Sequence, residues 1–268
     1  MAIISLISDL DPNHFQLANL KSRIVERYHS DFLSETYIAH NPEDLDTMAY
    51  HLIGALQVYP PNTIHISLCQ YSIASFNLII WRINNQFVIS SDNALISLID
   101  FLNFQESKRI FESTMTILSF KDYSDQFLRV IDDVKSGEWQ NIYLPSNQFL
   151  KAPPITQGLN IQNTEIHARI FVITHHGNLI LNIQREAFIQ AVQSNNFQIE
   201  IRTQVITKLS RKYQSNHRNN IGAIFNDTGY LEIFMVGGNL AQIFHFDKYS
   251  NNKITIKIGH DSRSQVNF

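Results

Sequence analysis

The sequence predicts an α/β N-terminal domain with a mostly parallel sheet, followed by a smaller C-terminal all-β, barrel-like domain. In the first half, continuous apolar runs alternate with segments in which apolar residues recur at helical spacing. In the second half, short strand-like runs follow one another with one helical exception. A stretch rich in Pro, Asn, Gln and Ser separates the halves. We therefore expect an α/β domain at 1–150, a linker at 151–164 and a β-domain at 165–268.

The elements of the first half follow in order. "AIISLIS" is an apolar run that ends at Asp9, as a strand buried on both faces would. Further strands are expected in "ETYIAH", "TIHISLC", "FNLIIWRI" and "QFVIS". Helices are expected around Leu17–Tyr28, in "DLDTMAYHLIGALQV", in "ALISLIDFL" and around Leu128–Val134, the last ended by Gly137. Asn84-Asn85, which tolerates positive φ, predicts a hairpin turn.

The second half contains six strand-like runs: "RIFVIT", "NLILNI", "FQIEIRT", "IGAIF", "YLEIFMV" and "KITIKIG". "QREAFIQAVQ" is the helical exception. So many short strands in about 100 residues are typical of a small barrel or sandwich.

Composition excludes several classes of function. The formal net charge is −3 and no Lys/Arg block exceeds two residues, which argues against nucleic acid as a partner. The single cysteine, Cys69, excludes an intrachain disulfide framework and a multi-cysteine metal site. The N-terminus does not resemble a signal peptide and no apolar run is long enough to span a membrane, so we expect a cytoplasmic protein without a membrane partner.

Common catalytic and cofactor signatures are missing, among them the Walker A loop, G-x-G-x-x-G, H-E-x-x-H and G-x-S-x-G. His175-His176 invites a metal hypothesis, but adjacent side chains on an extended strand point to opposite faces. We therefore expect turn histidines, no metal and no cofactor. The following Gly177-Asn178 predicts a tight turn, which is either purely structural or exposes an asparagine to a ligand.

Six segments, taken in order from Ile4 to about Phe246, resemble one family. "YPPNTIHISLC" looks like "FPPGTVHVAVVD", "FVISSDNALI" like "FVgPDNGLL", and "ITHHGNLILNI" like "IDRFGNLITNI". "FNDTGYLEIFMVGGNLAQIF" is similar to "nSsGyLEIAvnGGNAAeLL", and the stretches around "LISDL" and "IAHNPEDLDTMAYHL" also fit. The chain thus resembles the S-adenosylmethionine (SAM) hydroxide adenosyltransferases, relatives of the fluorinases and chlorinases.

The resemblance implies a homotrimer in which SAM lies between the N-domain of one subunit and the C-domain of its neighbour. It also implies ligand-binding roles for Asp9, which matches the acid that binds the ribose hydroxyls, and for Asn178, which matches the "FGN" asparagine. Asp92 and Asn93 match the "PDN" pair, whose role is ligand binding or structural. Asp9 has an alternative role as a strand-end acid that caps the next turn.

The residues that react in the family's hydrolases are not retained. Where those enzymes use an Asp–Arg–His set, the chain has Cys69, Phe76 or Asn77, and Asp122. The positions that bind methionine are also changed, to His14, Thr174 and Asp227. Cys69 is interpreted as a buried strand cysteine rather than a nucleophile, because no nearby base or cation is evident.

Three functions therefore remain open on the sequence. The leading hypothesis is a cytoplasmic homotrimer without SAM hydrolase activity that retains a pocket for adenosine or another nucleoside. The second is an active SAM hydrolase that forms adenosine and L-methionine with other groups positioning the water. The third is a non-catalytic structural or interaction protein.

Overall fold

The computed structural model describes residues 3–11, 13–29, 31–37, 44–68, 78–99, 106–109, 120–145, 150–193, 195–213, 218–250 and 252–259. The chain forms two compact units, Met1–Pro154 and Ile155–Phe268. No helix within the described ranges combines the length and the apolar character that crossing a membrane requires.

The first unit contains β1 (Ile3–Ser8), α1 (Phe15–Arg27), β2 (Phe32–Tyr37), α2 (Leu45–Val58), β3 (Ile64–Leu68), β4 (Leu78–Ile83), β5 (Gln86–Ser91), α3 (Leu95–Leu98), β6 (Glu106–Arg109), α4 (Phe120–Ser136), α5 (Trp139–Ile142) and β7 (Leu144–Pro145). The second contains β8 (Asn160–Ile161), β9 (Glu165–Ile173), β10 (Leu179–Gln184), α6 (Arg185–Val192), β11 (Phe197–Ile201), β12 (Gln204–Ile206), β13 (Ile221–Phe225), β14 (Tyr230–Met235), α7 (Leu240–Ile243) and β15 (Lys253–Ile258).

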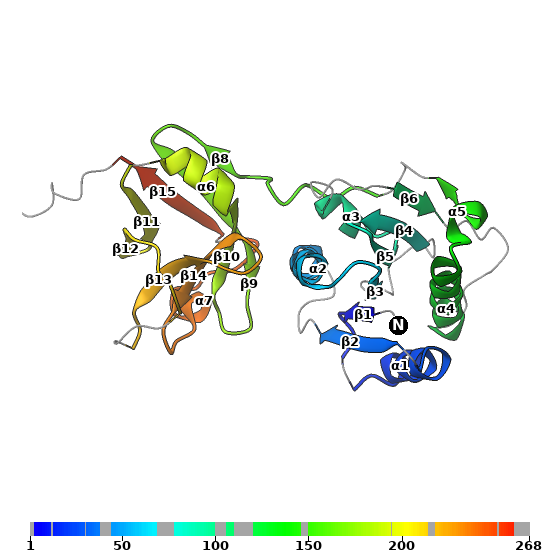
Figure 1. Ribbon diagram of the computed structural model, residues 1–268. Helices are drawn as coiled ribbons and strands as arrows, with labels where there is room; N and C mark the ends of the chain where they lie inside the picture. The colour runs from blue at the N-terminus through cyan, green and yellow to red at the C-terminus, as the bar shows by residue number, and fades with distance from the viewer. Residues whose placement is uncertain are drawn as a thin grey trace, which may run out of the picture. The chain divides into compact units, whose positions relative to one another are not determined.

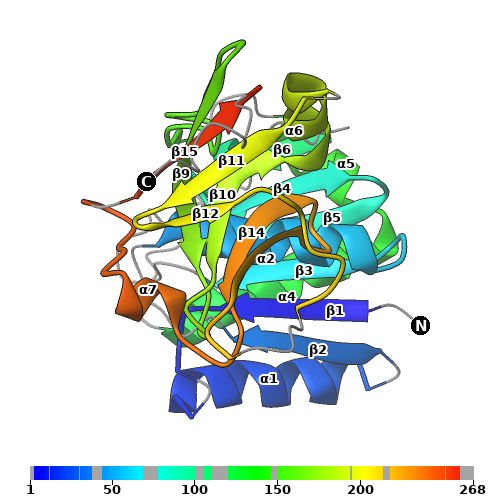
Figure 2. The same cartoon turned by 90° about the vertical axis from the view of Figure 1, so that its left-hand side faces the viewer.

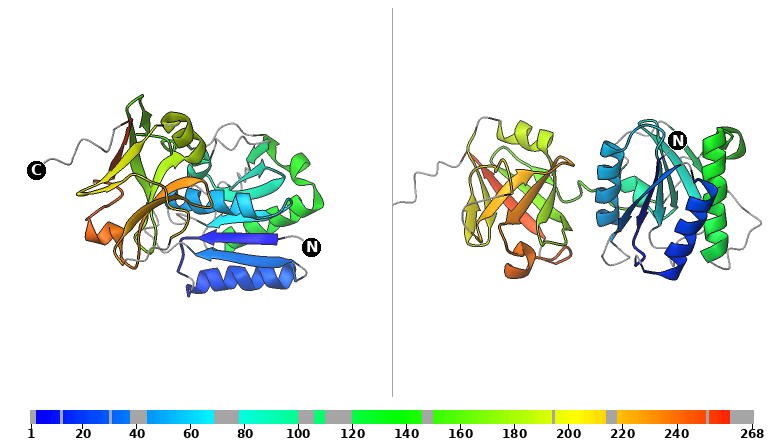
Figure 3. Two further views of the ribbon diagram at one scale, coloured as in Figure 1. Left: turned by 60° about the vertical axis from the view of Figure 1, so that its left-hand side comes forward. Right: turned by 60° about the horizontal axis from the view of Figure 1, so that its bottom comes forward.

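The first unit is a sheet with the strand order β2-β1-β3-β5-β4-β6-β7 (Figure 2). Strands β2, β1, β3 and β5 are parallel, and the hairpin strand β4 with β6 and β7 continues the sheet in antiparallel fashion. Helices α1 and α4 cover one face and α2 covers the other (Figures 1 and 3). The expected α/β class of this unit is thus confirmed.

The strand order reverses beside β1. The chain leaves β1 through α1 to reach β2 on one side, and then crosses through α2 to β3 on the other side. Right-handed crossovers in opposite directions place the two helices on opposite faces of the sheet. In open α/β sheets, ligands bind at the carboxyl ends of the strands where the order reverses. A ligand site in this unit is therefore expected at the end of β1.

Helices α1 and α4, about 100 residues apart in the chain, pack on each other and on the sheet. Leu17, Leu20 and Ile24 of α1 are buried in the core that α4 also joins. Tyr28 donates a 2.8 Å hydrogen bond from its hydroxyl to the carbonyl oxygen of Leu128. Two ion pairs, Arg23 with Asp125 and Arg27 with Asp132, link the exposed sides of the two helices.

A buried histidine lies in the middle of this sheet. His65 of β3 is fully buried, and its Nε2 atom lies 2.7 Å from Oε1 of Gln86. The amide nitrogen of Gln86 already donates to the carbonyl oxygen of Leu56, so Oε1 must accept and His65 Nε2 carries the proton. Burial lowers the pKa of His65 to about 4, and the hydrogen bond with Gln86 opposes this shift only in part.

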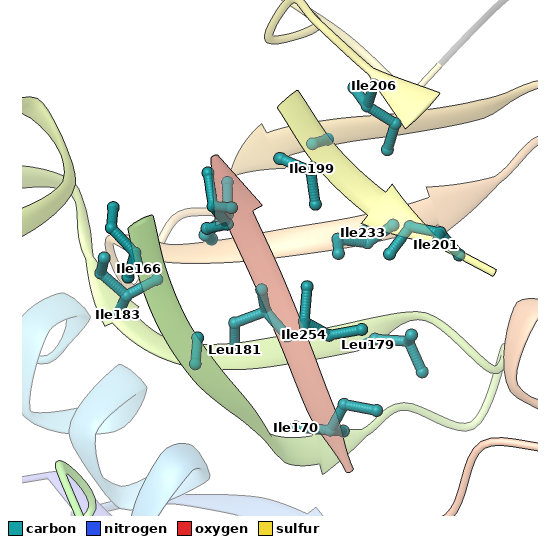
Figure 4. Close-up of a cluster of buried hydrophobic side chains, with 14 of the residues drawn as sticks. Ile166, Ile170, Leu179, Leu181, Ile183, Ile199, Ile201, Ile206, Ile233 and Ile254 are labelled. Carbon is teal, nitrogen blue, oxygen red and sulfur yellow. The ribbon is translucent and has the colours of Figure 1, made fainter. Parts of the chain in front are cut away.

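The second unit is an antiparallel, nearly closed barrel with the strand order β12-β11-β15-β9-β10-β14-β13, in which β8 also pairs with β9. The two ends of this order approach each other through a bridge between Leu209, which follows β12, and Ala223 of β13. Figure 4 shows its apolar interior, with Ile166, Ile170, Leu179, Leu181, Ile183, Ile199, Ile201, Ile206, Ile233 and Ile254 labelled. The expected barrel-like C-terminal domain is confirmed.

The chain between the units is anchored on both sides. The Leu150 N–H donates to Oδ1 of Asp92, and the Ala152 N–H donates to Oγ of Ser97, both at 2.8 Å. In the second unit, Asn182 donates through Nδ2 to the carbonyl oxygen of Ile155 at 3.0 Å. The two units divide after Pro154, within the stretch expected to be a linker.

Several elements differ from the expected ones. The strand expected in "ETYIAH" begins earlier, at Phe32, because it pairs along the whole length of β1. The helix expected in "ALISLIDFL" is only the four-residue α3, since the N–H of Ile99 donates to the carbonyl oxygen of Ile96 in a tightened last turn. Strands β6, β7, β8 and β12 and the short helices α5 and α7 were not expected.

Candidate functional site

A polar cluster in the barrel surrounds a buried carboxylate. Glu232 lies in β14, where every residue is buried, and is only 6% exposed. Its Oε1 atom accepts a 2.8 Å hydrogen bond from Nδ2 of Asn178. Its Oε2 atom accepts 3.1 Å hydrogen bonds from the Tyr213 hydroxyl and from Nδ2 of Asn226. Burying a carboxylate is costly unless donors satisfy it, and these three donors supply that compensation.

The three donors come from different segments. Asn178 immediately precedes β10, which pairs with β14 so that Ile180 faces Glu232. Asn226 is in the β13–β14 turn, and its Oδ1 accepts the N–H groups of Thr228 and Tyr230. Tyr213 comes from the connection between β12 and β13, and its ring packs against Phe234 with the centroids 5.1 Å apart. Glu232 therefore links the β9–β10 turn, the β12–β13 connection and the β13–β14 turn.

Glu232 also fixes the orientation of the Asn178 amide. A carboxylate oxygen can only accept, so the group that faces it must be the NH₂ of Asn178. The Oδ1 atom is then left as an acceptor, and it receives no hydrogen bond from the described residues. A ligand hydroxyl or amine is the complementary group for this oxygen.

The turn that carries Asn178 is closely packed against the loop before α7. Gly177 has a φ of +80°, and a Cβ atom at this position would lie 2.0 Å from Oδ1 of Asn239. Asn239 caps α7 by accepting the Gln242 N–H at 2.8 Å, and the N–H of Ala241 donates to the carbonyl oxygen of Gly177. Glycine is therefore required here both by the backbone conformation and by the close approach.

A cavity of about 740 Å³ opens beside this cluster. Its lining combines two histidines, amide and carboxylate groups, apolar side chains and a Gly-Gly turn: His175, His176, Asn178, Tyr213, Glu232, Phe234, Met235, Val236, Gly237, Gly238 and Asn239. His175 and His176 lie in the turn after β9, exposed, with their rings 5.5 Å apart. The volume and the few polar groups on an apolar wall suit a small molecule.

In the first unit, the polar residues predicted from the sequence follow the parallel strands. Asp9 follows β1, is partly exposed, and donates its N–H to the carbonyl oxygen of Leu68 at the end of β3, at 3.3 Å. In the turn after β1, Ser8 Oγ accepts the Leu10 N–H and Asp11 Oδ1 accepts the Asn13 N–H. Asp9 therefore lies at the carboxyl edge, at the point where the strand order reverses.

Asp92 and Asn93 follow β5 at the same edge, two strands away from β1. Both are buried. Asp92 accepts the Leu150 N–H, and Asn93 accepts the Leu95 N–H at 3.2 Å. These contacts stabilise the start of α3 and the end of the first unit; a ligand role for the pair stays a prediction.

Of the positions that correspond to the family's reacting residues, only Asp122 is described. It lies in the first turn of α4, near Asp125, which forms ion pairs with Arg23 and Lys121. Burial raises the pKa of Asp125, but the hydrogen bonds from Lys121 and Arg23 outweigh it, so the pKa lies below its ordinary value. Cys69, Phe76 and Asn77 lie outside the described residues.

Two of the three positions that differ from the family's methionine-binding residues have local roles. His14 is the N-cap of α1, where its Nδ1 accepts the Gln16 N–H at 3.3 Å. Thr174 closes the turn after β9, because its Oγ1 accepts the Asn178 N–H at 3.1 Å. Asp227 is exposed in the β13–β14 turn, outside the set of described residues that line the cavity.

Sequence reasoning identified Asn178 but missed its partners. Glu232 could have been found, because a single acid in the otherwise apolar strand "YLEIFM" needs donors. Asn226 precedes a turn, where asparagine is common, so its presence indicates a turn more than a partner of Glu232. Tyr213 gave none, since it reaches Glu232 from a loop 19 residues earlier in the chain.

Comparisons with known proteins agree with this architecture. The chain resembles the structure of an uncharacterized conserved protein from Thermotoga maritima, with a TM-score of 0.76, 16% identity, and coverage of 94% of this chain and 99% of that one. It also resembles a conserved hypothetical protein from Thermus thermophilus, with a TM-score of 0.70, 14% identity, and coverage of 96% and 99%. At these identities the likeness shows the fold alone.

No curated protein matches the sequence. Residues 168–252, which include β10, β14 and the cluster around Glu232, match the SAM hydroxide adenosyltransferase C-terminal domain. The second unit of the chain is therefore similar to the C-terminal domain of the SAM hydroxide adenosyltransferases.

Proposed function

We propose that the protein binds adenosine or a closely related nucleoside and does not hydrolyse SAM. It acts as a homotrimer in which the cavity beside Asn178 forms part of the ligand site. The family supplies the ligand class, since the matched domain belongs to proteins that act on SAM. The fold and the domain do not decide activity, so the residues at the site carry this proposal.

The observation that supports binding is the orientation of Asn178. Its NH₂ group is held by Glu232, which leaves Oδ1 as an acceptor at a cavity large enough for a nucleoside. Ribose hydroxyls and the adenine amine are donors of the matching kind. Asp9 supports the same proposal, because a carboxylate at the carboxyl edge of the first unit can accept two ribose hydroxyls.

The residues at the reacting positions support loss of hydrolysis. Attack by water on the C5′–sulfur bond needs a positioned nucleophile and a group that takes its proton. Loss of general-base help typically costs about 10²–10⁴-fold in rate, and a misplaced attacker can cost about 10²-fold more. Cys69, Phe76 or Asn77, and Asp122 replace the Asp–Arg–His set, so no cation stands at the position of the arginine.

The resemblance to the family, in which two subunits contribute to each ligand, supports the proposed trimer. Asp9 and Asn178 belong to different units of this chain. We propose that Asp9 of one subunit and Asn178 of its neighbour bind the same nucleoside. Formation of the trimer is then required for nucleoside binding.

The test combines turnover and binding on the purified full chain. SAM is incubated with the protein and adenosine and methionine are measured, while adenosine is titrated by calorimetry. We expect no SAM hydrolysis above background, adenosine binding to the wild type, and loss of binding in Asp9→Ala and Asn178→Ala. Glu26→Ala, which removes an exposed acid from α1, is the matched control and should bind normally.

Two outcomes would replace the proposal. Steady release of adenosine from SAM would show an active hydrolase whose water is positioned by other groups. Absence of adenosine binding together with absence of turnover would favour a structural or interaction role. Unchanged adenosine affinity in Asp9→Ala would show that the ribose does not contact this acid.

A further inference from the structure

The cavity lies beside a segment of unusual charge. No acidic residue occurs between Glu200 and Asp227, although the chain as a whole has a formal charge of −3. The same segment contains five basic residues: Arg202, Lys208, Arg211, Lys212 and Arg218. Four of these five residues, all except Arg202, lie in the connection that leads from β12 to β13.

This connection contributes directly to the wall of the cavity. Tyr213 lines the cavity and donates to Glu232, and it is preceded by the exposed Arg211 and Lys212. Arg218 belongs to the same connection. A Cβ atom built on Gly237, another lining residue, would lie 3.4 Å from Cγ and 3.5 Å from Nε of Arg218. The Arg218 side chain therefore lies against the Gly-Gly wall of the cavity.

The backbone holds Arg218 at this place. The Asn219 N–H donates to the carbonyl oxygen of Val236 at 2.8 Å, and the Val236 N–H donates to the carbonyl oxygen of Asn220 at 2.9 Å. These bonds extend the β13–β14 ladder beyond its last residues. The position of the arginine relative to Gly237 is thus set by the sheet rather than by a free loop.

Arg218 forms no ion pair with any acid in the described ranges. Glu232, the acid that lines the cavity, already accepts hydrogen bonds at both oxygens from Asn178, Tyr213 and Asn226. Arg202, by contrast, is engaged, since its guanidinium lies 4.9 Å over the Phe246 ring. Arg218 is thus a cation beside a lining residue of the cavity, with no acid partner among the described residues, and is complementary to an anionic ligand group.

We propose that the ligand of this cavity is a nucleoside phosphate, whose phosphate is bound by Arg218 and attracted by Arg211 and Lys212. This inference rests on the proposed nucleoside-binding function and specifies its substrate class. A guanidinium presents planar paired donors that match phosphate oxygens, and two further cations directly before the lining residue Tyr213 suit a group with more than one negative charge. The exposed rings of His175 and His176 at the same cavity provide further donors.

The experiment compares adenosine with adenosine 5′-monophosphate on the full chain by calorimetry. We expect the phosphate to increase affinity by about tenfold or more, and Arg218→Gln to remove this gain while leaving adenosine affinity unchanged. Lys253→Gln, which removes an exposed charge from β15, is the matched control and should retain the gain. Raising the salt concentration should weaken binding of the monophosphate and spare adenosine, because salt screens exposed charges.

The outcomes separate this inference from the function on which it rests. Equal affinity for adenosine and its monophosphate would overturn the phosphate site and leave the nucleoside pocket in place. Binding of neither compound would overturn both. A single-stranded oligonucleotide that binds while the monophosphate does not would also overturn the inference, and would assign the basic segment to nucleic acid. Arg218→Gln must keep the wild-type melting temperature, so that lost affinity reports the charge alone.

Discussion

Asn178 donates through Nδ2 to Oε1 of Glu232 at 2.8 Å, which ties the turn before β10 to the centre of β14. The bond serves two purposes. It satisfies part of a buried carboxylate, and it presents the amide oxygen of Asn178 as an acceptor. Stability of the barrel and preparation of the cavity therefore depend on the same atom pair.

The first prediction concerns this carboxylate. Glu232→Gln replaces one accepting oxygen by an NH₂ group, so at least one of the three donors loses its acceptor. We expect a loss of about 1–3 kcal/mol in the free energy of unfolding. Denaturant titration measures it. Glu200→Gln, which changes a partly exposed acid paired with Lys257, is the control and should cost about 1 kcal/mol or less. Equal losses in the two variants would mean that the hydrogen bonds to Glu232 contribute no more to stability than the ion pair between Glu200 and Lys257.

The second prediction compares two glycines with nearly the same backbone conformation. Gly177 and Gly229 have φ values of +80° and +83°, but only a Cβ at Gly177 would meet a neighbour, Asn239. Gly229→Ala should cost about 1–2 kcal/mol from the left-handed conformation alone. Gly177→Ala should cost more, by about 1 kcal/mol, because Asn239 must leave its cap on α7. Thermal unfolding of both variants decides this, and a larger loss in Gly229→Ala would contradict the packing described for Gly177.

The third prediction is a pH dependence that arises from His65. Its pKa is lowered to about 4 in the folded protein, whereas an unfolded histidine has a pKa of about 6.5. Between these values the unfolded state binds the extra proton, so stability should fall as the pH decreases from about 6.5 to about 4. The loss amounts to about 3 kcal/mol.

His65→Gln removes the titrating group and should flatten this part of the stability curve, measured by urea unfolding at several pH values. His29→Gln, which removes an exposed histidine, should leave the slope unchanged. A slope that survives in His65→Gln would assign the pH dependence to other groups.

The fourth prediction concerns assembly. If two subunits complete each nucleoside site, the protein at micromolar concentration should scatter light as three chains of 31.0 kDa, about 93 kDa together. A mass near that of one chain would remove the basis for a shared site. Adenosine binding should then be lost on dilution below the concentration at which the trimer dissociates.

Local patterns predicted those parts of the fold that local physics determines. Asn84 and Asn85 were expected to form a hairpin turn, and their φ values are 50° and 60°. Gly137, expected to end a helix, follows α4 with a φ of +82°. The early start of β2 was missed, because its pairing with β1 sets its limits. The short α3 was also missed, and its last turn ends with the bond from the Ile99 N–H to the carbonyl oxygen of Ile96.

In the candidate site, too, residues set by local patterns could be predicted and residues set by distant contacts could not. Asn178 could be predicted because the Gly-Asn turn is a local signal. The hydrogen bond from the Leu150 N–H to Asp92 joins residues 58 positions apart, and no sequence pattern predicts it. Arg218 is comparable, since its place beside Gly237 results from the pairing of two strand ends.

The packing of α1 on α4 has a consequence for synthesis of the chain. The buried face of α1 is translated about 100 residues before the helix that covers it. At a synthesis rate of about 5–20 residues per second, α4 is made roughly 5–20 s after Leu17, Leu20 and Ile24. During this interval the nascent N-terminal half carries an uncovered apolar stripe, which makes it a natural client for chaperones that bind exposed hydrophobic segments.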